Sequence, residues 1–156
     1  MNTKTLSKAA IIAALYVALT FISALFGLAS GAIQIRISEA LTILPLFTPA
    51  AIPGLTIGCF LSNILTGCAL WDVVFGTLAT LLGAVGTYLL KRKRYLGIIP
   101  PILSNTLIIP FVLRWVYGAD EVLPYLFFTV GVGEIISCGI LGIILIKIIK
   151  KNNNIF

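Results

Sequence analysis

The sequence predicts an all-α membrane protein that crosses the bilayer several times. Of its 156 residues, 60% are hydrophobic and only 10% are charged, and the mean hydropathy is +1.13. A soluble domain of this size has too little interior to bury so much apolar surface. Because one span needs about 20 mostly apolar residues, the chain has room for about six spans with short connections. We therefore expect a single transmembrane domain that comprises residues 1–156.

Six apolar runs mark the expected transmembrane helices. They comprise residues 9–29, 37–50, 52–65, 71–90, 95–113 and 122–146. The second and third runs are short and contain Pro45, Pro49 and Pro53. A proline frees a backbone carbonyl, which hydrocarbon tolerates mainly where protein or a cavity covers it. We therefore expect this pair of helices to be covered, with a turn at residues 49–54.

The basic residues predict the orientation. With six helices, three basic groups fall on one face, and together they hold nine of the 11 Lys and Arg residues. They are Lys4 and Lys8, residues 91–94, and Lys147, Lys150 and Lys151. Cytoplasmic loops carry the excess of Lys and Arg, so we expect both termini in the cytoplasm. The positive charge is thus explained by topology and lipid contact, and we expect no nucleic-acid partner.

The stretch at residues 33–39 differs from the apolar runs on either side. Apolar and polar residues alternate here, which is the period of an extended segment. Its charged residues, Arg36 and Glu39, lie on the predicted outer face together with Asp72. An acidic outer mouth favours a cationic solute or one rich in N–H donors. The alternative is structural, because Arg36 and Glu39 can pair at i,i+3 if they are helical.

Three polar residues lie deeper in the predicted spans: Asn63, Asn105 and Glu134. Glu134 is about 12 residues into its helix, which at ~1.5 Å per residue places it roughly 18 Å deep. A carboxylate near the bilayer middle costs at least ~2.5 kcal/mol unless it is partnered or hydrated. We expect Glu134 to contact a ligand, and the alternative is a structural bond to Asn105 or to a hydroxyl group.

The first helix carries small residues four apart. They are Ala9, Ala10, Ala13, Ala14 and Ala18. Such a strip allows another helix to approach closely. The sequence leaves two interpretations open: docking of a partner, or packing within this protein.

Residues for catalysis are missing from the sequence. There is no Gly-x-x-x-x-Gly-Lys phosphate loop, no histidine, and no pair of carboxylates on one helix. Cys59, Cys68 and Cys138 are widely separated in apolar helices, which favours small buried side chains over a metal or redox site. We expect no enzyme activity, no cofactor and no metal. Any ATP-driven step requires another subunit.

Several runs resemble a known family. They are residues 34–42, Leu44-Pro45, residues 49–54, Gly58-Cys59, Asn63 and residues 71–76. Together they are similar to the queuosine-precursor transporter (QueT) family, whose members are substrate-binding S components of energy-coupling factor (ECF) transporters. The resemblance implies a six-helix S component in the plasma membrane of a prokaryote. Its implied partners are a transmembrane coupling subunit, docked on the alanines of the first helix, and two cytoplasmic ATPases.

The implied solute is a 7-deazaguanine such as 7-aminomethyl-7-deazaguanine. A carboxylate can accept two parallel hydrogen bonds from a guanine-like edge, and an amide offers one donor and one acceptor. We expect Glu39 and Glu134 as acidic contacts and Asn63 and Asn105 as amide contacts. Arg36 and Asp72 are expected at the mouth, and the candidates for stacking on the bicycle are Trp71, Trp115 and Tyr117.

Two alternatives remain open at this point. The first keeps the S component but changes the solute to another vitamin-like heterocycle, such as a flavin or a pterin. The second is a small secondary transporter or a membrane scaffold that works without ATPases.

Overall fold

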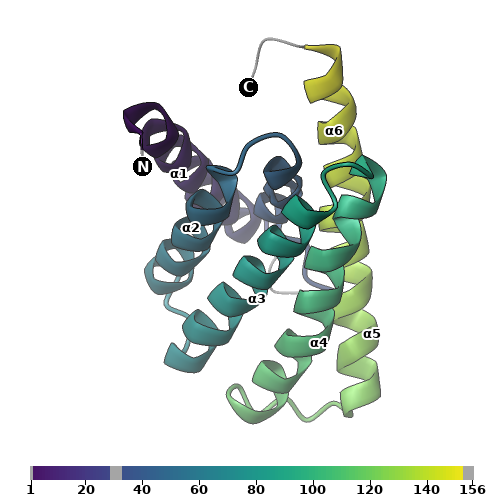
Figure 1. Cartoon of the computed structure of the whole chain (residues 1–156). Coiled ribbons are helices and arrows are strands. Elements are labelled where there is room, and N and C mark those ends of the chain that lie inside the picture. The colour runs from purple at the N-terminus through teal and green to yellow at the C-terminus, as the bar shows by residue number, and fades with distance from the viewer. Residues whose placement is uncertain (1, 29–32, 153–156) are drawn as a thin grey trace.

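The computed structural model describes residues 2–28 and 33–152, and all regular structure in this part of the chain is helical. The helices are α1 (Thr3–Leu25), η1 (Ile37–Leu46), α2 (Ala51–Leu65), α3 (Leu70–Leu89), η2 (Arg94–Ile98), α4 (Ile99–Trp115), α5 (Leu123–Glu134), η3 (Ile135–Leu141) and α6 (Gly142–Lys151). The last three are continuous and form one rod (Figure 1). The all-α membrane fold predicted from the sequence is confirmed.

Four of these helical stretches are long and apolar enough to cross a membrane. They are Thr3–Leu25, Leu70–Leu89, Arg94–Trp115 and Leu123–Lys151. The two Pro-containing helices, η1 and α2, have only 10 and 15 residues. The first helix begins at Thr3, six residues before the prediction, and its predicted end at Ala29 lies outside the described residues.

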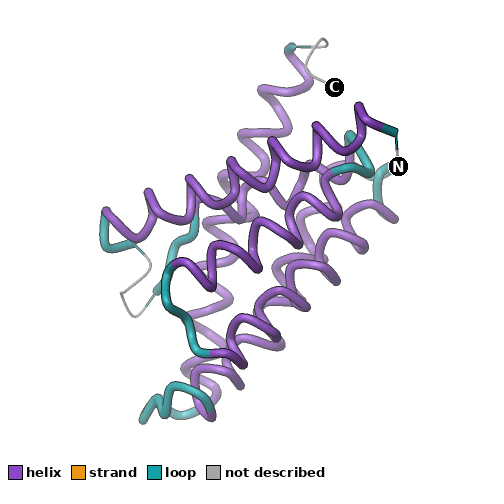
Figure 2. The backbone as a smooth tube through the Cα atoms, turned by 90° about the vertical axis from the view of Figure 1, so that its left-hand side faces the viewer, coloured by secondary structure: helices purple, strands orange, loops and turns teal. Residues whose placement is uncertain are grey.

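The long helices run in alternating directions. Figure 1 shows that the start of α1, the turn between α3 and α4, and the end of α6 lie at the same end of the bundle. We call this the basic end, because the three predicted groups of Lys and Arg all belong to these segments. The turns after α1, α2 and α4 lie at the opposite end, as the tube in Figure 2 also shows.

The short helix η1 forms the centre of the molecule. Every residue from Ser38 to Leu46 is buried, and the helix packs against α1, α3, η3 and α6. It is a 3-10 helix rather than an α-helix, with Pro45 inside it. Such a long 3-10 run is uncommon. The sequence correctly predicted a covered, Pro-containing helix here, but not its tighter winding.

Close packing of α1 on α2 divides the alanine strip into two parts. Ala9 and Ala13 are buried and face two glycines of α2, Gly54 and Gly58. A Cβ added to Gly54 would lie 2.8 Å from the carbonyl oxygen of Ala9. The other three alanines, Ala10, Ala14 and Ala18, are exposed. Ala9 and Ala13 therefore serve internal packing, and the three exposed alanines remain available to a partner.

Candidate substrate-binding site

An extended segment of residues 34–36 crosses the bundle between α1 and the α5–η3 rod. Its backbone is tied on both sides, because the Arg36 N–H donates to the Ser137 hydroxyl at 3.1 Å and the Ile37 N–H donates to the Ser23 hydroxyl at 2.8 Å. Arg36 has φ −106° and ψ 107°, which is extended backbone, and the helix starts at Ile37. The predicted extended stretch is therefore confirmed for residues 34–36, while Ile37, Ser38 and Glu39 are helical.

Gly133 permits this crossing. A Cβ on Gly133 would lie only 2.2 Å from the carbonyl oxygen of Gln34, well inside van der Waals contact. Only glycine lets the backbone of the segment lie directly on α5. Since the next residue is Glu134, this contact also fixes the height of the segment relative to that carboxylate.

Glu39 is buried with an incomplete set of hydrogen bonds. The Tyr16 hydroxyl donates to its Oε1 atom, whereas the buried Oε2 atom has no partner. Within the described residues Arg36 forms no salt bridge with Glu39, although the two residues close a 3-10 turn in which the Glu39 N–H donates to the Arg36 carbonyl oxygen at 3.0 Å. An unpaired buried acceptor costs about 1–3 kcal/mol, and more when it is charged. Glu39 therefore has unused capacity to accept a hydrogen bond.

Glu134 comes close to Glu39 from the other side of the bundle. It ends α5, immediately before the π-helical segment η3, and its Oε2 accepts a hydrogen bond from the Cys138 thiol at 3.2 Å. The side chain of Asn105 lies beside both carboxylates. π-helical turns are rare and often mark functional sites. The two carboxylates and the amide thus lie together, and their role as a binding site stays a prediction.

These side chains line a cavity of about 30 Å³, which we call the inner cavity. Its lining consists of Gln34, Arg36, Glu39, Cys59, Gly76, Thr80, Asn105, Ile109, Val130 and Glu134. The volume suits about one water molecule rather than a whole solute.

A larger space of about 390 Å³, the outer cavity, leads toward the end opposite the basic end. Arg36, Gln34 and Ile109 line both cavities, so the two adjoin. The combined space is in the range of small-molecule sites. The outer cavity also contains Asn63 and Asp72.

Tyr117 closes one side of the outer cavity. Its hydroxyl donates to Asp72 Oδ2 at 2.8 Å and accepts from the backbone N–H of Ala69 at 3.1 Å. Partial burial raises the pKa of Tyr117 above its ordinary value, and the neighbouring Asp72 acts in the same direction. The hydroxyl therefore stays protonated at neutral pH and holds Asp72 in place. Of the three aromatic residues named as stacking candidates, Tyr117 lies in this cavity.

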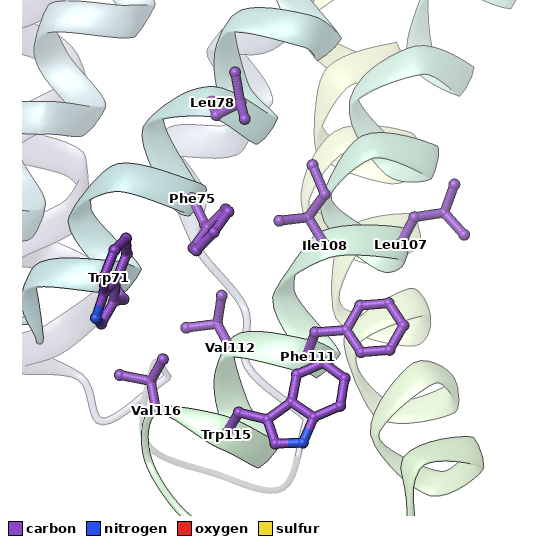
Figure 3. A pocket seen from close by; sticks show the side chains of 9 residues that line it. All are labelled: Trp71, Phe75, Leu78, Leu107, Ile108, Phe111, Val112, Trp115 and Val116. Carbon is purple, nitrogen blue, oxygen red and sulfur yellow. The ribbon is translucent and has the colours of Figure 1, made fainter.

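Trp71 and Trp115 lie elsewhere. Together with Phe75 and Phe111 they line an apolar groove of about 710 Å³ between α3 and α4 (Figure 3). Trp71 is 58% exposed and Trp115 is 70% exposed. Figure 3 shows no polar group among the labelled side chains other than the indole nitrogens. Such a surface suits the hydrocarbon of a bilayer, and the structure does not bring Trp71 together with the other candidate site residues.

Glu39, Glu134 and Cys138 place three possible metal-ligand atoms within 4.8 Å of one another. The Cys138 sulfur is already engaged, because it donates to Glu134 and also lies 3.5 Å from the Glu39 carbonyl oxygen. The arrangement is thus explained as a hydrogen-bonded group, and the expectation of no metal stays a prediction.

The sequence reasoning missed Tyr16 and Cys138 as members of the site. A signal for Tyr16 exists, because Tyr16, Thr20 and Ser23 are spaced 4 and 3 residues apart and form a polar row on α1. All three are buried, and the Thr20 hydroxyl donates to the Ser38 hydroxyl at 2.9 Å. A polar row on an apolar membrane helix indicates a face turned toward the protein interior.

The model of the QueT transporter family matches residues 6–151. The chain belongs to the QueT transporter family. This QueT family member is also 45% identical over 73 residues to the queuosine precursor transporter QueT of Lactococcus lactis subsp. cremoris.

That alignment covers 46% of this QueT family member and 42% of the relative, so the chain spans less than half the length of the relative it matches. No solved structure matches the chain. The family resemblance inferred from the sequence is confirmed. Family and relative both point to a membrane transporter rather than an enzyme.

Proposed function

We propose that this protein captures a queuosine precursor, a 7-deazaguanine such as 7-aminomethyl-7-deazaguanine, as the S component of an ECF importer. The observation that carries this proposal is the unpaired Oε2 atom of Glu39 in the inner cavity. A guanine-like edge presents two parallel N–H donors, which a carboxylate accepts with matching geometry. The family match and the relative's name support the same class of solute.

In this proposal each cavity binds a different part of the solute. The bicycle lies in the outer cavity against Tyr117, and one end reaches the carboxylates of Glu39 and Glu134 in the inner cavity. Asn105 beside both carboxylates reads the carbonyl or the ring edge with its amide. Arg36, Asn63 and Asp72 orient the solute in the outer cavity. The inner cavity has to widen when the solute binds, because its present volume of about 30 Å³ is too small for a ring.

The proposed cycle begins with capture from outside the cell. The basic end faces the cytoplasm by the positive-inside tendency, so the outer cavity faces out. ATP hydrolysis by partner subunits then drives release inside. The membrane concerned is the plasma membrane of a prokaryote, and the bacterial relative supports this.

The experiment that tests the solute is mass spectrometry of the small molecules that the purified protein retains. We expect a 7-deazaguanine at close to one molecule per protein. The affinity of the protein for added 7-aminomethyl-7-deazaguanine, measured by calorimetry, gives an independent value. Recovery of a flavin or a pterin would overturn the choice of solute while leaving the S-component role intact.

The partner subunits dock on the exposed alanines of α1 in this proposal. Ala10, Ala14 and Ala18 form a smooth strip that no other part of the described chain covers. We expect Ala14→Trp to prevent copurification of the coupling subunit and the ATPases, because the bulky ring keeps another helix from approaching. Solute binding by the isolated variant should be unchanged.

Val85→Trp serves as the matched control for this prediction. Val85 lies on α3 and is 39% exposed, so it presents the same bulky ring to the bilayer on a different helix. It should retain the partner subunits. If the unmodified protein never copurifies with ATPases, the S-component role is wrong and a secondary transporter becomes the better interpretation.

A further inference from the structure

A separate cavity lies at the basic end of the molecule. It has a volume of about 490 Å³ and is lined by Arg92, Lys93, Arg94, Tyr95, Leu96 and Lys150. The first five residues belong to the connection between α3 and α4, whereas Lys150 comes from α6. These segments lie side by side in Figure 1, and Lys150 Nζ lies 3.5 Å from the Tyr95 hydroxyl. The cavity is thus built by tertiary structure.

No carboxylate in the part of the chain that the structure describes pairs with the four cations of this cavity. Within the described residues none of them forms a salt bridge with an Asp or Glu side chain. The nearest acidic residue along the α5–α6 rod is Glu134, 16 residues before Lys150, which corresponds to about 24 Å at 1.5 Å per residue. That distance exceeds the Debye length of about 8 Å at physiological ionic strength. No acidic side chain of the described residues therefore neutralises these cations, and their charge can be balanced by an anion from another molecule.

Aromatic rings hold two of the cations in place without neutralising them. Lys150 Nζ lies 4.5 Å from the centroid of the Tyr95 ring, and the Arg94 guanidinium lies 5.3 Å from that of Phe47. Cation–π contacts of this kind restrict the side chain but leave its N–H donors free for an anion. A set of preordered donors around a cavity suits a phosphate group, which accepts several charge-assisted hydrogen bonds.

Exposed apolar side chains follow the cations along the chain. Leu96 lines the cavity and is 43% exposed, and Ile99, at the start of α4, is 42% exposed. Tyr95, which is 52% exposed, has the amphipathic character typical of side chains at a membrane interface. A soluble anion would gain nothing from these neighbours, whereas an acyl chain would cover them.

We propose that this cavity binds the phosphate headgroup of an anionic phospholipid of the inner leaflet. The phosphate lies among Arg92, Lys93, Arg94 and Lys150, and an acyl chain lies along Leu96 and Ile99. The lipid links η2 to α6 and supplies the negative charge that no described acidic side chain provides at this cavity. This site is distinct from the solute cavities and does not depend on which solute is transported.

Native mass spectrometry of the full-length protein with equal amounts of phosphatidylglycerol and phosphatidylcholine tests the proposal. We expect one retained phosphatidylglycerol per protein and preference over phosphatidylcholine. The double variant Arg94→Gln/Lys150→Gln should bind phosphatidylglycerol more weakly by about fivefold for each charge removed. Lys147→Gln/Lys151→Gln removes the same charge from the same end outside the cavity, and it should bind phosphatidylglycerol like the parent.

Three results would overturn the proposal. Equal losses in the two double variants would indicate general attraction to the basic end. Displacement of phosphatidylglycerol by millimolar glycerol 1-phosphate would indicate a site for soluble phosphates. The protein could also fail to retain phosphatidylglycerol, while Arg94→Gln/Lys150→Gln alone loses a copurifying protein. That combination would show that the cavity binds an acidic surface of a partner protein.

Discussion

Replacing Glu134 by Gln is expected to weaken binding of 7-aminomethyl-7-deazaguanine by about 10- to 100-fold, because a hydrogen bond to a charged group contributes about 1.5–3 kcal/mol. The change keeps the shape of the side chain and the oxygen that accepts from the Cys138 thiol, but replaces the other carboxyl oxygen by an amide group that only donates. Calorimetry on the purified variant measures the affinity. A variant that binds as tightly as the parent would remove Glu134 from the site.

A second ligand shows which end of the solute Glu134 contacts. A 7-deazaguanine without the aminomethyl arm has the same ring edge but no ammonium group. If Glu134 contacts the ring, both ligands lose affinity by the same factor in Glu134→Gln. If it contacts the ammonium, only the aminomethyl compound does. Glu121→Gln is the control, because Glu121 is an exposed acid in the α4–α5 connection, outside both the inner and the outer cavity.

Replacing Gly133 by Ala is expected to lower stability by about 1–3 kcal/mol and to abolish most solute binding. The added methyl group would lie 2.2 Å from the Gln34 carbonyl oxygen, so the segment of residues 34–36 has to move away from α5. That movement displaces Arg36 and changes the shape of both cavities. Thermal unfolding in detergent and calorimetry with the solute measure the two effects.

Gly131→Ala is the matched control for this prediction. Gly131 lies in the same helix, and a Cβ there would meet its nearest atom, in the Thr106 side chain, at an acceptable 3.4 Å. Its melting temperature and affinity should stay close to those of the parent. Equal behaviour of Gly133→Ala and Gly131→Ala would show that the contact between α5 and the segment is not required.

Composition and charge were sufficient to predict the membrane fold, because the length of a span and its orientation in the bilayer follow simple physical rules. Apolar runs long enough for hydrocarbon predicted the spans, and three groups of Lys and Arg predicted a shared face. The deep carboxylate of Glu134 could be recognised because an ionisable group in hydrocarbon is costly without a partner. Asn105 followed from the same reasoning, and the structure places it beside Glu134 and Glu39.

Details set by tertiary contacts could not be read from the sequence. The 3-10 winding of η1 and the π-helical turn after Glu134 are packing outcomes with no local sequence pattern. The division of the alanine strip depends on where Gly54 and Gly58 of α2 meet α1. Trp71 shows the limit for single residues. Neighbouring residues on a helix point about 100° apart, so Trp71 lines the apolar groove while Asp72 lines the outer cavity.

Helix α1 carries a buried polar row on one face and an exposed strip of alanines on another. Its buried row contains Tyr16, which holds Glu39, and Ser23, which holds the backbone at Ile37. Its other face carries the exposed alanines. A partner that shifts α1 on binding changes the geometry around Glu39 at the same time. Linkage then requires that the solute alter the partner's affinity by the same factor by which the partner alters the solute's.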